Sequence, residues 1–327
     1  MIIGFCVPPG QAWTRAMDAL EREFGTSLSV LRGAEACIAA APTLDAVVAN
    51  PMERSFYERA VALKAVFVPF VGLDHLPADL LLSRGTAVHN CHGNAESVAE
   101  RALALALAGL GRIVEYHNDL RAGIWHGFWV GRGREDFWSS LYRKRCAILG
   151  AGAVGRALAG LLKAFSCRVV GFRLRTGLPT PAGFDEMHAD PAAAVAGADL
   201  VFVTLPLTEA TAGLVDGRLL AAMRGAFLVN VGRGPVVDER ALYEALSGGM
   251  LAGAGLDVWY DYPPPGSTEG APSRFPIHGL PNVILSPHVA GSTREAVAQN
   301  VERTAGNLAL WLRTGRAEHL VDLSASY

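Results

Sequence analysis

Short apolar runs alternate with amphipathic segments through the first third of the chain. Apolar residues recur at helical spacing from Gln11 to Phe24, which predicts a helix. The apolar runs predict four strands, over Ile2–Val7, Ala46–Ala49, Ala65–Pro69 and Ala87–Asn90. Strands that alternate with helices indicate a parallel sheet covered on both faces. A long helix, about Ser97 to Asn118, should leave this unit, followed by an ordered but irregular connector from Trp125 to Trp138.

The same alternation resumes after residue 145. The predicted strands are Cys146–Leu149, Arg168–Phe172, Leu200–Val203, Phe227–Val231, Gly253–Asp257 and Val283–Leu285. Helices are expected between them, for example over Asp190–Ala196, Asp216–Ala222 and Asp238–Leu246. This pattern predicts a doubly wound nucleotide-binding sheet. The proline-rich stretch from Tyr260 to Pro281 should be a surface loop, and a last helix, Ser292 to Arg313, should return the chain to the first unit.

A glycine motif, G-A-G-A-V-G, joins the first strand of the second unit to a helix expected over Arg156–Phe165. Gly150 permits the tight turn, Gly152 lets the backbone approach a pyrophosphate, and Gly155 lets the helix pack on the strand. The backbone N–H groups that follow, at Ala153 and Val154, would bind the anion together with the helix dipole. We therefore predict a dinucleotide site here.

Composition and charge narrow the class of protein. The 327 residues are enough for two domains, and half of them are apolar. A net charge of −2 gives no reason to expect nucleic acid or an anionic membrane as a partner, and no metal is expected. The most apolar helical stretch, Ala102 to Leu110, is too short to span a bilayer. Five scattered cysteines indicate reduced thiols in a soluble, cytoplasmic protein.

Three further motifs lie at the carboxyl ends of predicted strands, where open parallel sheets bind ligands. They are L-P-L-T at Leu205–Thr208, V-N-V-G-R-G-P-V-V-D at Val229–Asp238 and S-P-H-V-A-G-S-T at Ser286–Thr293. Together with the glycine motif and G-L-D-V at Gly255–Val258, this series resembles the D-isomer-specific 2-hydroxyacid dehydrogenase family from about Leu63 to Asn307.

The resemblance implies an α/β fold of two doubly wound parallel-sheet domains with a cleft between them. Residues 1–95 and 291–327 would form a flavodoxin-like substrate domain, and residues 96–290 a Rossmann domain. It also implies hydride transfer between a nicotinamide and C2 of a small 2-oxo or 2-hydroxy acid, in a homodimer. The aromatic connector Trp125–Trp138 is our candidate for the dimer contact.

The resemblance assigns roles to residues of these motifs. Arg233 would bind the substrate carboxylate and polarise the 2-oxo group, a role that suits the planar guanidinium. His288 would be the acid/base residue. Val71 and Gly72, in P-F-V-G-L-D at Pro69–Asp74, would receive the carboxylate, and Asn94 would either contact a ligand or cap a helix. Further cofactor contacts are implied for Leu205, Pro206, Val231, Gly232, Asp257 and Gly291, with capping of the following loop as an alternative for Asp257.

One departure from the family pattern concerns the partner of His288. Most members carry a Glu in D-V-x-x-x-E-P, whereas this chain reads D-V-W-Y-D-Y-P and places Tyr262 there. A phenol can orient an imidazole but does not favour its charged form as a carboxylate does. As the pH rises, keto-acid reduction should therefore fall off at a lower pH than in relatives that carry the Glu. Formate dehydrogenases also replace this Glu and share the Trp that is Trp259 here, so formate oxidation is an alternative. A non-catalytic dinucleotide sensor is another.

The second departure concerns the cofactor. NAD enzymes place an acidic residue at the end of the second strand of the nucleotide fold, to bind the ribose hydroxyls. Here that strand ends in Arg173, with Arg175 two residues on and no acid before Asp185. Two guanidiniums suit a 2′-phosphate, so we expect NADP in preference to NAD. NADP preference makes glyoxylate or hydroxypyruvate reduction the first substrate expectation.

Overall fold

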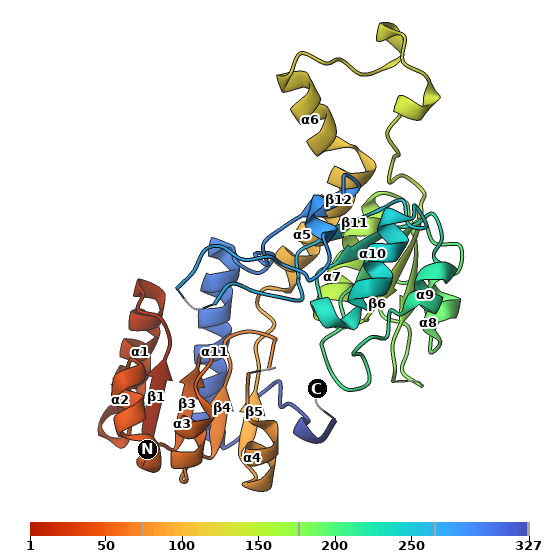
Figure 1. The fold of residues 1–327 in the computed structure, drawn as a ribbon. Coiled ribbons are helices and arrows are strands. Elements are labelled where there is room, and N and C mark those ends of the chain that lie inside the picture. The colour runs from red at the N-terminus through yellow and green to blue at the C-terminus, as the bar shows by residue number, and fades with distance from the viewer. Residues whose placement is uncertain (74, 176, 265, 326–327) are drawn as a thin grey trace. The chain divides into compact units, whose positions relative to one another are not determined.

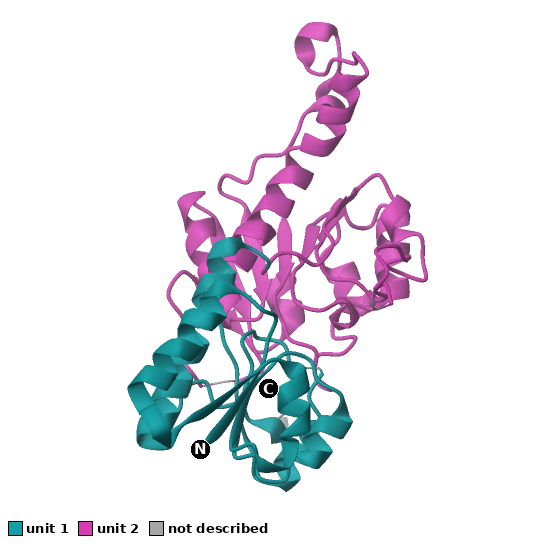
Figure 2. Cartoon of the chain, turned by 90° about the vertical axis from the view of Figure 1, so that its left-hand side faces the viewer, with its two compact units in different colours: residues 1–94, 292–327 teal, residues 95–291 magenta. Residues whose placement is uncertain are grey.

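The computed structural model describes residues 1–73, 75–175, 177–264 and 266–325. The chain forms two compact units, residues 1–94 with 292–327, and residues 95–291 (Figure 2). Each unit contains one parallel sheet with helices on its faces, which confirms the predicted α/β class.

The first unit contains a five-stranded parallel sheet in the order β2-β1-β3-β4-β5, the flavodoxin-like order (Figure 1). Its strands are β1 Ile2–Cys6, β2 Ser29–Arg32, β3 Ala46–Ala49, β4 Ala65–Phe67 and β5 Ala87–His89. Its helices are α1 Gln11–Phe24, α2 Ala34–Ala39, α3 Arg54–Arg59, α4 Ala78–Ser83 and α11 Arg294–Thr314. Helices α1 and α11 pack on one face, where Phe5, Phe67 and Leu308 share a core. A second core, with Val47, Val66 and Leu81, fills the opposite face.

The chain after α11 returns to the edge of this sheet. Leu320 forms an antiparallel bridge with His89, and the Val321 N–H donates to the Val88 carbonyl oxygen at 2.8 Å. The C-terminal segment therefore lies along the outer edge of β5.

The second unit contains a seven-stranded parallel sheet in the order β12-β11-β10-β9-β6-β7-β8. Its strands are β6 Arg145–Leu149, β7 Arg168–Phe172, β8 Glu186–His188, β9 Leu200–Val203, β10 Phe227–Asn230, β11 Gly253–Leu256 and β12 Val283–Leu285. Its helices are α5 Ala95–Leu110, α6 Ile113–Arg121, α7 Ala153–Ala164, α8 Pro191–Val195, α9 Gly217–Ala222 and α10 Glu239–Ser247. The sheet has the doubly wound nucleotide-binding order with β12 added at one edge.

Aspartates begin three of these helices at the expected places. The carboxylates of Asp190, Asp216 and Asp238 accept backbone N–H groups of the first turns of α8, α9 and α10. Such caps satisfy N–H groups that have no partner within the helix.

Several elements differ from the sequence prediction, which did not include the short helices α2, α3 and α4. The single helix expected over Ser97–Asn118 is wrong, because α5 ends at Leu110 and Arg112 takes a left-handed φ of 51° before α6 begins. Strands β2 and β8 were not predicted. Both are edge strands whose residues are half-exposed or exposed, so they lack the apolar run that marks a buried strand.

Helix α6 and the segment that follows it extend away from the sheet of their own unit (Figure 1). The segment Trp125–Trp138 is irregular, as predicted, with single turns of 3-10 helix over Phe128–Val130 and Arg134–Asp136. We call residues 113–142 the arm. Many of its large apolar side chains are exposed, among them Trp125, Phe128, Trp129 and Trp138.

Candidate active site

The glycine turn between β6 and α7 has the geometry of a pyrophosphate site. Gly150 has a φ of 117°, a left-handed value that favours glycine, and a Cβ at Gly155 would clash with the Gly150 carbonyl oxygen. Gly152 begins α7 as its N-cap, and a Cβ there would meet nothing within 4 Å. The first N–H groups of α7, at Ala153 and Val154, directly follow this turn, so the residues present fit a dinucleotide phosphate.

The end of β7 carries the two arginines expected to select the cofactor. Arg173 donates from Nη1 to the Pro179 carbonyl oxygen at 3.1 Å and from Nη2 to that of Leu178, while Arg175 is exposed. Asp185 lies at the opposite end of β7, where it accepts from the Val169 N–H at 2.7 Å and pairs with Lys163. No described carboxylate between residues 173 and 184 takes the place of the NAD-type acid.

The turn after β10 presents Arg233. Asn230 shapes this turn, since its Oδ1 accepts from the Gly232 N–H at 3.0 Å and its Nδ2 donates to the Arg233 carbonyl oxygen at 3.0 Å. The Arg233 side chain is half-buried, and its Nη1 donates to the Gly232 carbonyl oxygen at 2.9 Å. A Cβ at Gly232 would clash with the Leu205 carbonyl oxygen, so this glycine lets the L-P-L-T loop pack against the arginine turn.

His288 follows β12 in a loop that Asp257 holds. His288 is exposed and has a left-handed φ of 57°, which is uncommon for a residue with a side chain. The Asp257 carboxylate, at the end of β11 and 1% exposed, accepts from the Val289 N–H at 3.1 Å, the Ala290 N–H at 3.0 Å and the Ser286 hydroxyl. Asp257 therefore caps the loop after β12 that presents the histidine, rather than the loop directly after Asp257 that was the alternative to its cofactor contact.

Tyr262 lies beside His288. The two ring centroids are 5.5 Å apart with an interplanar angle of 48°. The Tyr262 hydroxyl accepts from the Trp259 N–H at 3.1 Å, and the Trp259 indole N–H donates to the Ser286 carbonyl oxygen at 2.9 Å. The loops after β11 and β12 are thus joined by hydrogen bonds, and the structure brings Tyr262, His288 and Asp257 into one group.

The expected substrate residues of the first unit follow β4 and β5. The Val71 carbonyl oxygen accepts from the Asn90 amide at 3.3 Å, and Gly72 is next in the same loop. The Oδ1 atom of Asn94 is buried and has no hydrogen-bond partner among the described residues, so it does not cap α5. Asp74, the last residue of the P-F-V-G-L-D motif, lies outside the described residues.

Sequence reasoning missed the residues that support these loops. Thr204 donates its hydroxyl to the Gly150 carbonyl oxygen at 2.9 Å and so links the glycine turn to β9. Asn230 and Ser286 stand inside the recognised motifs, and Trp259 directly follows G-L-D-V. The side-chain hydrogen bonds of Ser286 and Trp259 join the loops after β11 and β12, whereas those of Asn230 stay within its own turn. Position in the motif was their only sequence signal.

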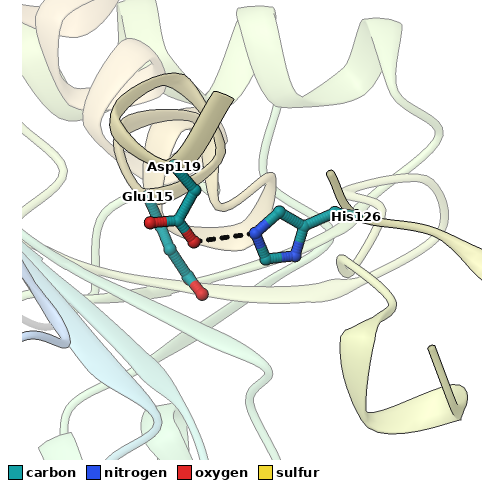
Figure 3. A group of neighbouring side chains, drawn as sticks. All are labelled: Glu115, Asp119 and His126. Carbon is teal, nitrogen blue, oxygen red and sulfur yellow. Dashed lines mark hydrogen bonds and ion pairs between the residues drawn. The ribbon is translucent and has the colours of Figure 1, made fainter. Parts of the chain in front are cut away.

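A second cluster of ligand-type side chains lies in the arm. Glu115 and Asp119 on α6 and His126 beyond it place one ligand atom each within 4.8 Å of one another (Figure 3). The His126 Nε2 is 2.8 Å from Asp119 Oδ2, its Nδ1 is 2.6 Å from Asp136 Oδ1, and Glu115 pairs with Arg112. Hydrogen bonds to Asp136 and Asp119 hold the pKa of His126 above its usual range. The cluster is thus a charge network that braces the arm.

Comparisons with known proteins agree with this arrangement. The sequence profile of the family described as "D-isomer specific 2-hydroxyacid dehydrogenase, NAD binding domain" matches residues 103–290. The chain is 36% identical over 247 residues to glyoxylate/hydroxypyruvate reductase B of Pectobacterium carotovorum, covering 75% of this chain and 74% of that one. It is 31% identical to a glyoxylate reductase of Korarchaeum cryptofilum, covering 85% and 82%.

Solved structures give the same result. The structure of an NADPH-dependent glyoxylate/hydroxypyruvate reductase from Sinorhizobium meliloti, in complex with NADP and malonate, superposes with a TM-score of 0.76. It is 27% identical to this chain, and the match covers 99% of this chain and 97% of that one. In the part of the chain that the structure describes, no helix is both long and apolar enough to cross a membrane.

Proposed function

The chain belongs to the D-isomer specific 2-hydroxyacid dehydrogenase family, and we propose that it reduces glyoxylate or hydroxypyruvate with NADPH. The observation that carries this proposal is that Arg233, Asp257 and His288 follow the carboxyl ends of three neighbouring strands, β10, β11 and β12, of one parallel sheet. Family membership makes the chain an NAD(P)-dependent oxidoreductase. The choice of substrate and of NADPH comes from the named relatives and from the two arginines after β7.

The residues divide the reaction between them. NADPH, when bound, supplies the hydride that reaches C2 of the keto acid. Arg233 holds the substrate carboxylate and draws charge toward the 2-oxo oxygen. His288 in its protonated form donates a proton to that oxygen, so the carbonyl becomes a hydroxyl and the imidazole is left neutral. Asp257 keeps the His288 loop in the conformation that presents the ring.

One unit binds the cofactor and the other binds the substrate. Residues 95–291 form the nucleotide unit, since the NAD-binding profile lies within it and the glycine turn fits a pyrophosphate. Residues 1–94 with 292–327 form the substrate unit. The backbone N–H groups of Val71 and Gly72 bind the carboxylate, and the unpartnered Oδ1 of Asn94 accepts from a bound ligand.

Arg175 distinguishes NADPH from NADH in this proposal. It is exposed, whereas Arg173 already donates to two carbonyl groups, so Arg175 is the guanidinium with room for a 2′-phosphate. Arg175→Ala should raise the KM for NADPH by about tenfold or more, the value of a charge-assisted hydrogen bond, and leave that for NADH unchanged. An equal effect on both cofactors would contradict this role.

Two further features belong to the proposal. The protein acts as a homodimer through the arm, whose exposed aromatic side chains suit an interface. Its compartment is the cytoplasm, a reducing environment that fits five free, buried cysteines.

The test is NADPH oxidation by a panel of glyoxylate, hydroxypyruvate, pyruvate and phenylpyruvate. Glyoxylate or hydroxypyruvate should give the highest kcat/KM, and Arg233→Ala should lower it by about 10²–10³-fold, as loss of one preorganised donor does. Arg218→Ala, an exposed arginine on α9, is the matched control. Tight dinucleotide binding without keto-acid turnover would favour a sensor, and NADP⁺ reduction by formate would favour formate oxidation.

A further inference from the structure

A cavity of about 420 Å³ lies within the first unit, at the carboxyl ends of β4 and β5 and beside the middle of α11. Helices α1 and α11 cover one face of the five-stranded sheet. The apolar core between them and the sheet includes residues of β1, β3 and β4 but none of β5, and the cavity lies beside β5. The described lining of the cavity does not include Val71, Gly72 or Asn94, although Asn90, which lines it, donates a hydrogen bond to the Val71 carbonyl oxygen.

The lining combines an apolar part with two opposite charges. Phe67 and Val68, both buried, and Leu310 of α11 supply apolar surface. Arg303 of α11 and Glu318 of the C-terminal segment, both exposed, supply one positive and one negative charge. A simple anion would be repelled by Glu318 and a simple cation by Arg303. A ligand that carries both charges complements the lining.

Two buried polar groups add hydrogen-bonding capacity. The His89 Nδ1 donates to the Glu318 carbonyl oxygen at 2.8 Å, because a carbonyl only accepts. Burial lowers the pKa of His89, so the ring is neutral near pH 7 and its Nε2 is an acceptor. The Thr304 side chain is 4% exposed, and its hydroxyl has no hydrogen-bond partner among the described residues.

We propose that this cavity binds an aliphatic α-amino acid. Its carboxylate pairs with Arg303. Its ammonium donates to acceptors among Glu318, His89 Nε2 and the Thr304 hydroxyl, and its side chain packs on Phe67, Val68 and Leu310. The volume suits such a ligand, since small-molecule pockets usually exceed about 300 Å³. No bond is made or broken there, so the site is one of binding only.

Titration calorimetry on the full chain tests the proposal with leucine and two analogues that each lack one charge. Leucine should bind with a millimolar or tighter Kd. Its deaminated analogue 4-methylpentanoate and its decarboxylated analogue 3-methylbutylamine should each bind about tenfold more weakly or worse. Absence of leucine binding at millimolar concentrations would overturn the proposal, and so would equal binding of all three compounds.

Two glycine variants locate the site. Gly306 lies in α11 and lines the cavity, and a Cβ there meets nothing within 4 Å, so Gly306→Leu fills the space without backbone strain. Gly160→Leu is the matched control, because Gly160 is an exposed residue of α7 with equal freedom. Gly306→Leu should abolish leucine binding and Gly160→Leu should leave it intact. Thr304→Val should weaken it about five- to tenfold. Leucine binding that survives in Gly306→Leu overturns the assignment.

Discussion

The contact between Tyr262 and His288 puts a neutral phenol where most of the family has a carboxylate. The Tyr262 hydroxyl already accepts from the Trp259 N–H, and its ring packs beside the imidazole. A packed aromatic neighbour fixes the position of the imidazole without favouring its charged form. Reduction requires the protonated ring, so the identity of residue 262 should set the upper pH limit of the reaction.

Tyr262→Glu should therefore extend keto-acid reduction to higher pH. A carboxylate beside the ring favours the imidazolium, and the alkaline limb of the pH–kcat/KM profile should move upward by roughly 1 pH unit. Tyr262→Gln is the matched control, since it has the same shape without the charge. Identical profiles for the Glu and Gln variants would show that a charge at this position does not affect the protonation of His288.

Asp257 offers a second test at the residue scale, because its carboxylate caps the histidine loop through three hydrogen bonds. Asp257→Asn turns an amide N–H₂ toward backbone N–H groups and leaves a buried donor without a partner, at a cost of about 1–3 kcal/mol in unfolding free energy. If the residue only positions His288, kcat falls while the Kd for NADPH is unchanged. A raised Kd for NADPH, measured by fluorescence titration, would instead assign Asp257 to the cofactor.

At the scale of elements, one buried carboxylate anchors the proline-rich loop that carries Tyr262. Glu239, in the first turn of α10 and 5% exposed, accepts from the Ser273 hydroxyl at 2.9 Å and from the N–H and guanidinium of Arg274. Burial alone would raise the pKa of Glu239, but Arg274 and the other donors outweigh it and hold this pKa below its usual range. The stability gained is therefore present above the usual carboxyl pKa and is lost as the pH falls through the folded-state pKa.

Arg274→Ala should accordingly lower the Tm at neutral pH by a few degrees. The difference from the unmodified protein should shrink in acid, where Glu239 is protonated in both. Thermal unfolding followed by circular dichroism across this pH range measures it. Arg240→Ala is the control, because Arg240 stacks on the neighbouring Phe275 ring at 5.2 Å and should show no such pH dependence. A pH-independent Tm difference for Arg274→Ala would contradict the ion pair.

The elements that the sequence predicted are those whose pattern is local. Buried strands such as Ala46–Ala49 and Leu200–Val203 are continuous apolar runs, and the aspartates before α8, α9 and α10 mark helix starts. The break at Arg112 does have a local mark that the single-helix prediction did not use, because Gly109 and Gly111 stand at the end of α5 and glycine is typical of a helix end. Edge strands such as β8 have no local mark, since their residues are half-exposed and form no apolar run.

At the scale of the molecule, the site also has parts with a local sequence pattern and parts without one. Arg233, His288 and the glycine turn are recognisable because each lies in a contiguous motif at a strand end. The hydrogen bonds from Asp257 to the loop after β12, or from Thr204 to the glycine turn, join segments far apart in sequence. Only the order of strands in the sheet brings those segments together.

The arm leads to the last prediction, because its exposed apolar side chains need a partner surface. Phe128 and Trp129 are 73% and 77% exposed and their rings stack at 5.8 Å. Each aromatic side chain buries about 150–250 Å² when covered, so a few of them supply most of the favourable free energy of association. The His126 network with Asp119 and Asp136 braces the segment that presents these rings.

Light scattering at micromolar concentration should show a dimer for the unmodified chain. The double variant Phe128→Ser with Trp129→Ser should be monomeric, because an interface that loses its central aromatic residues loses most of its binding energy. Val61→Ser is the control, since Val61 is a 67% exposed apolar residue in the other unit. A dimer that persists in the double variant would place the interface elsewhere, and a monomeric unmodified chain would refute the dimer itself.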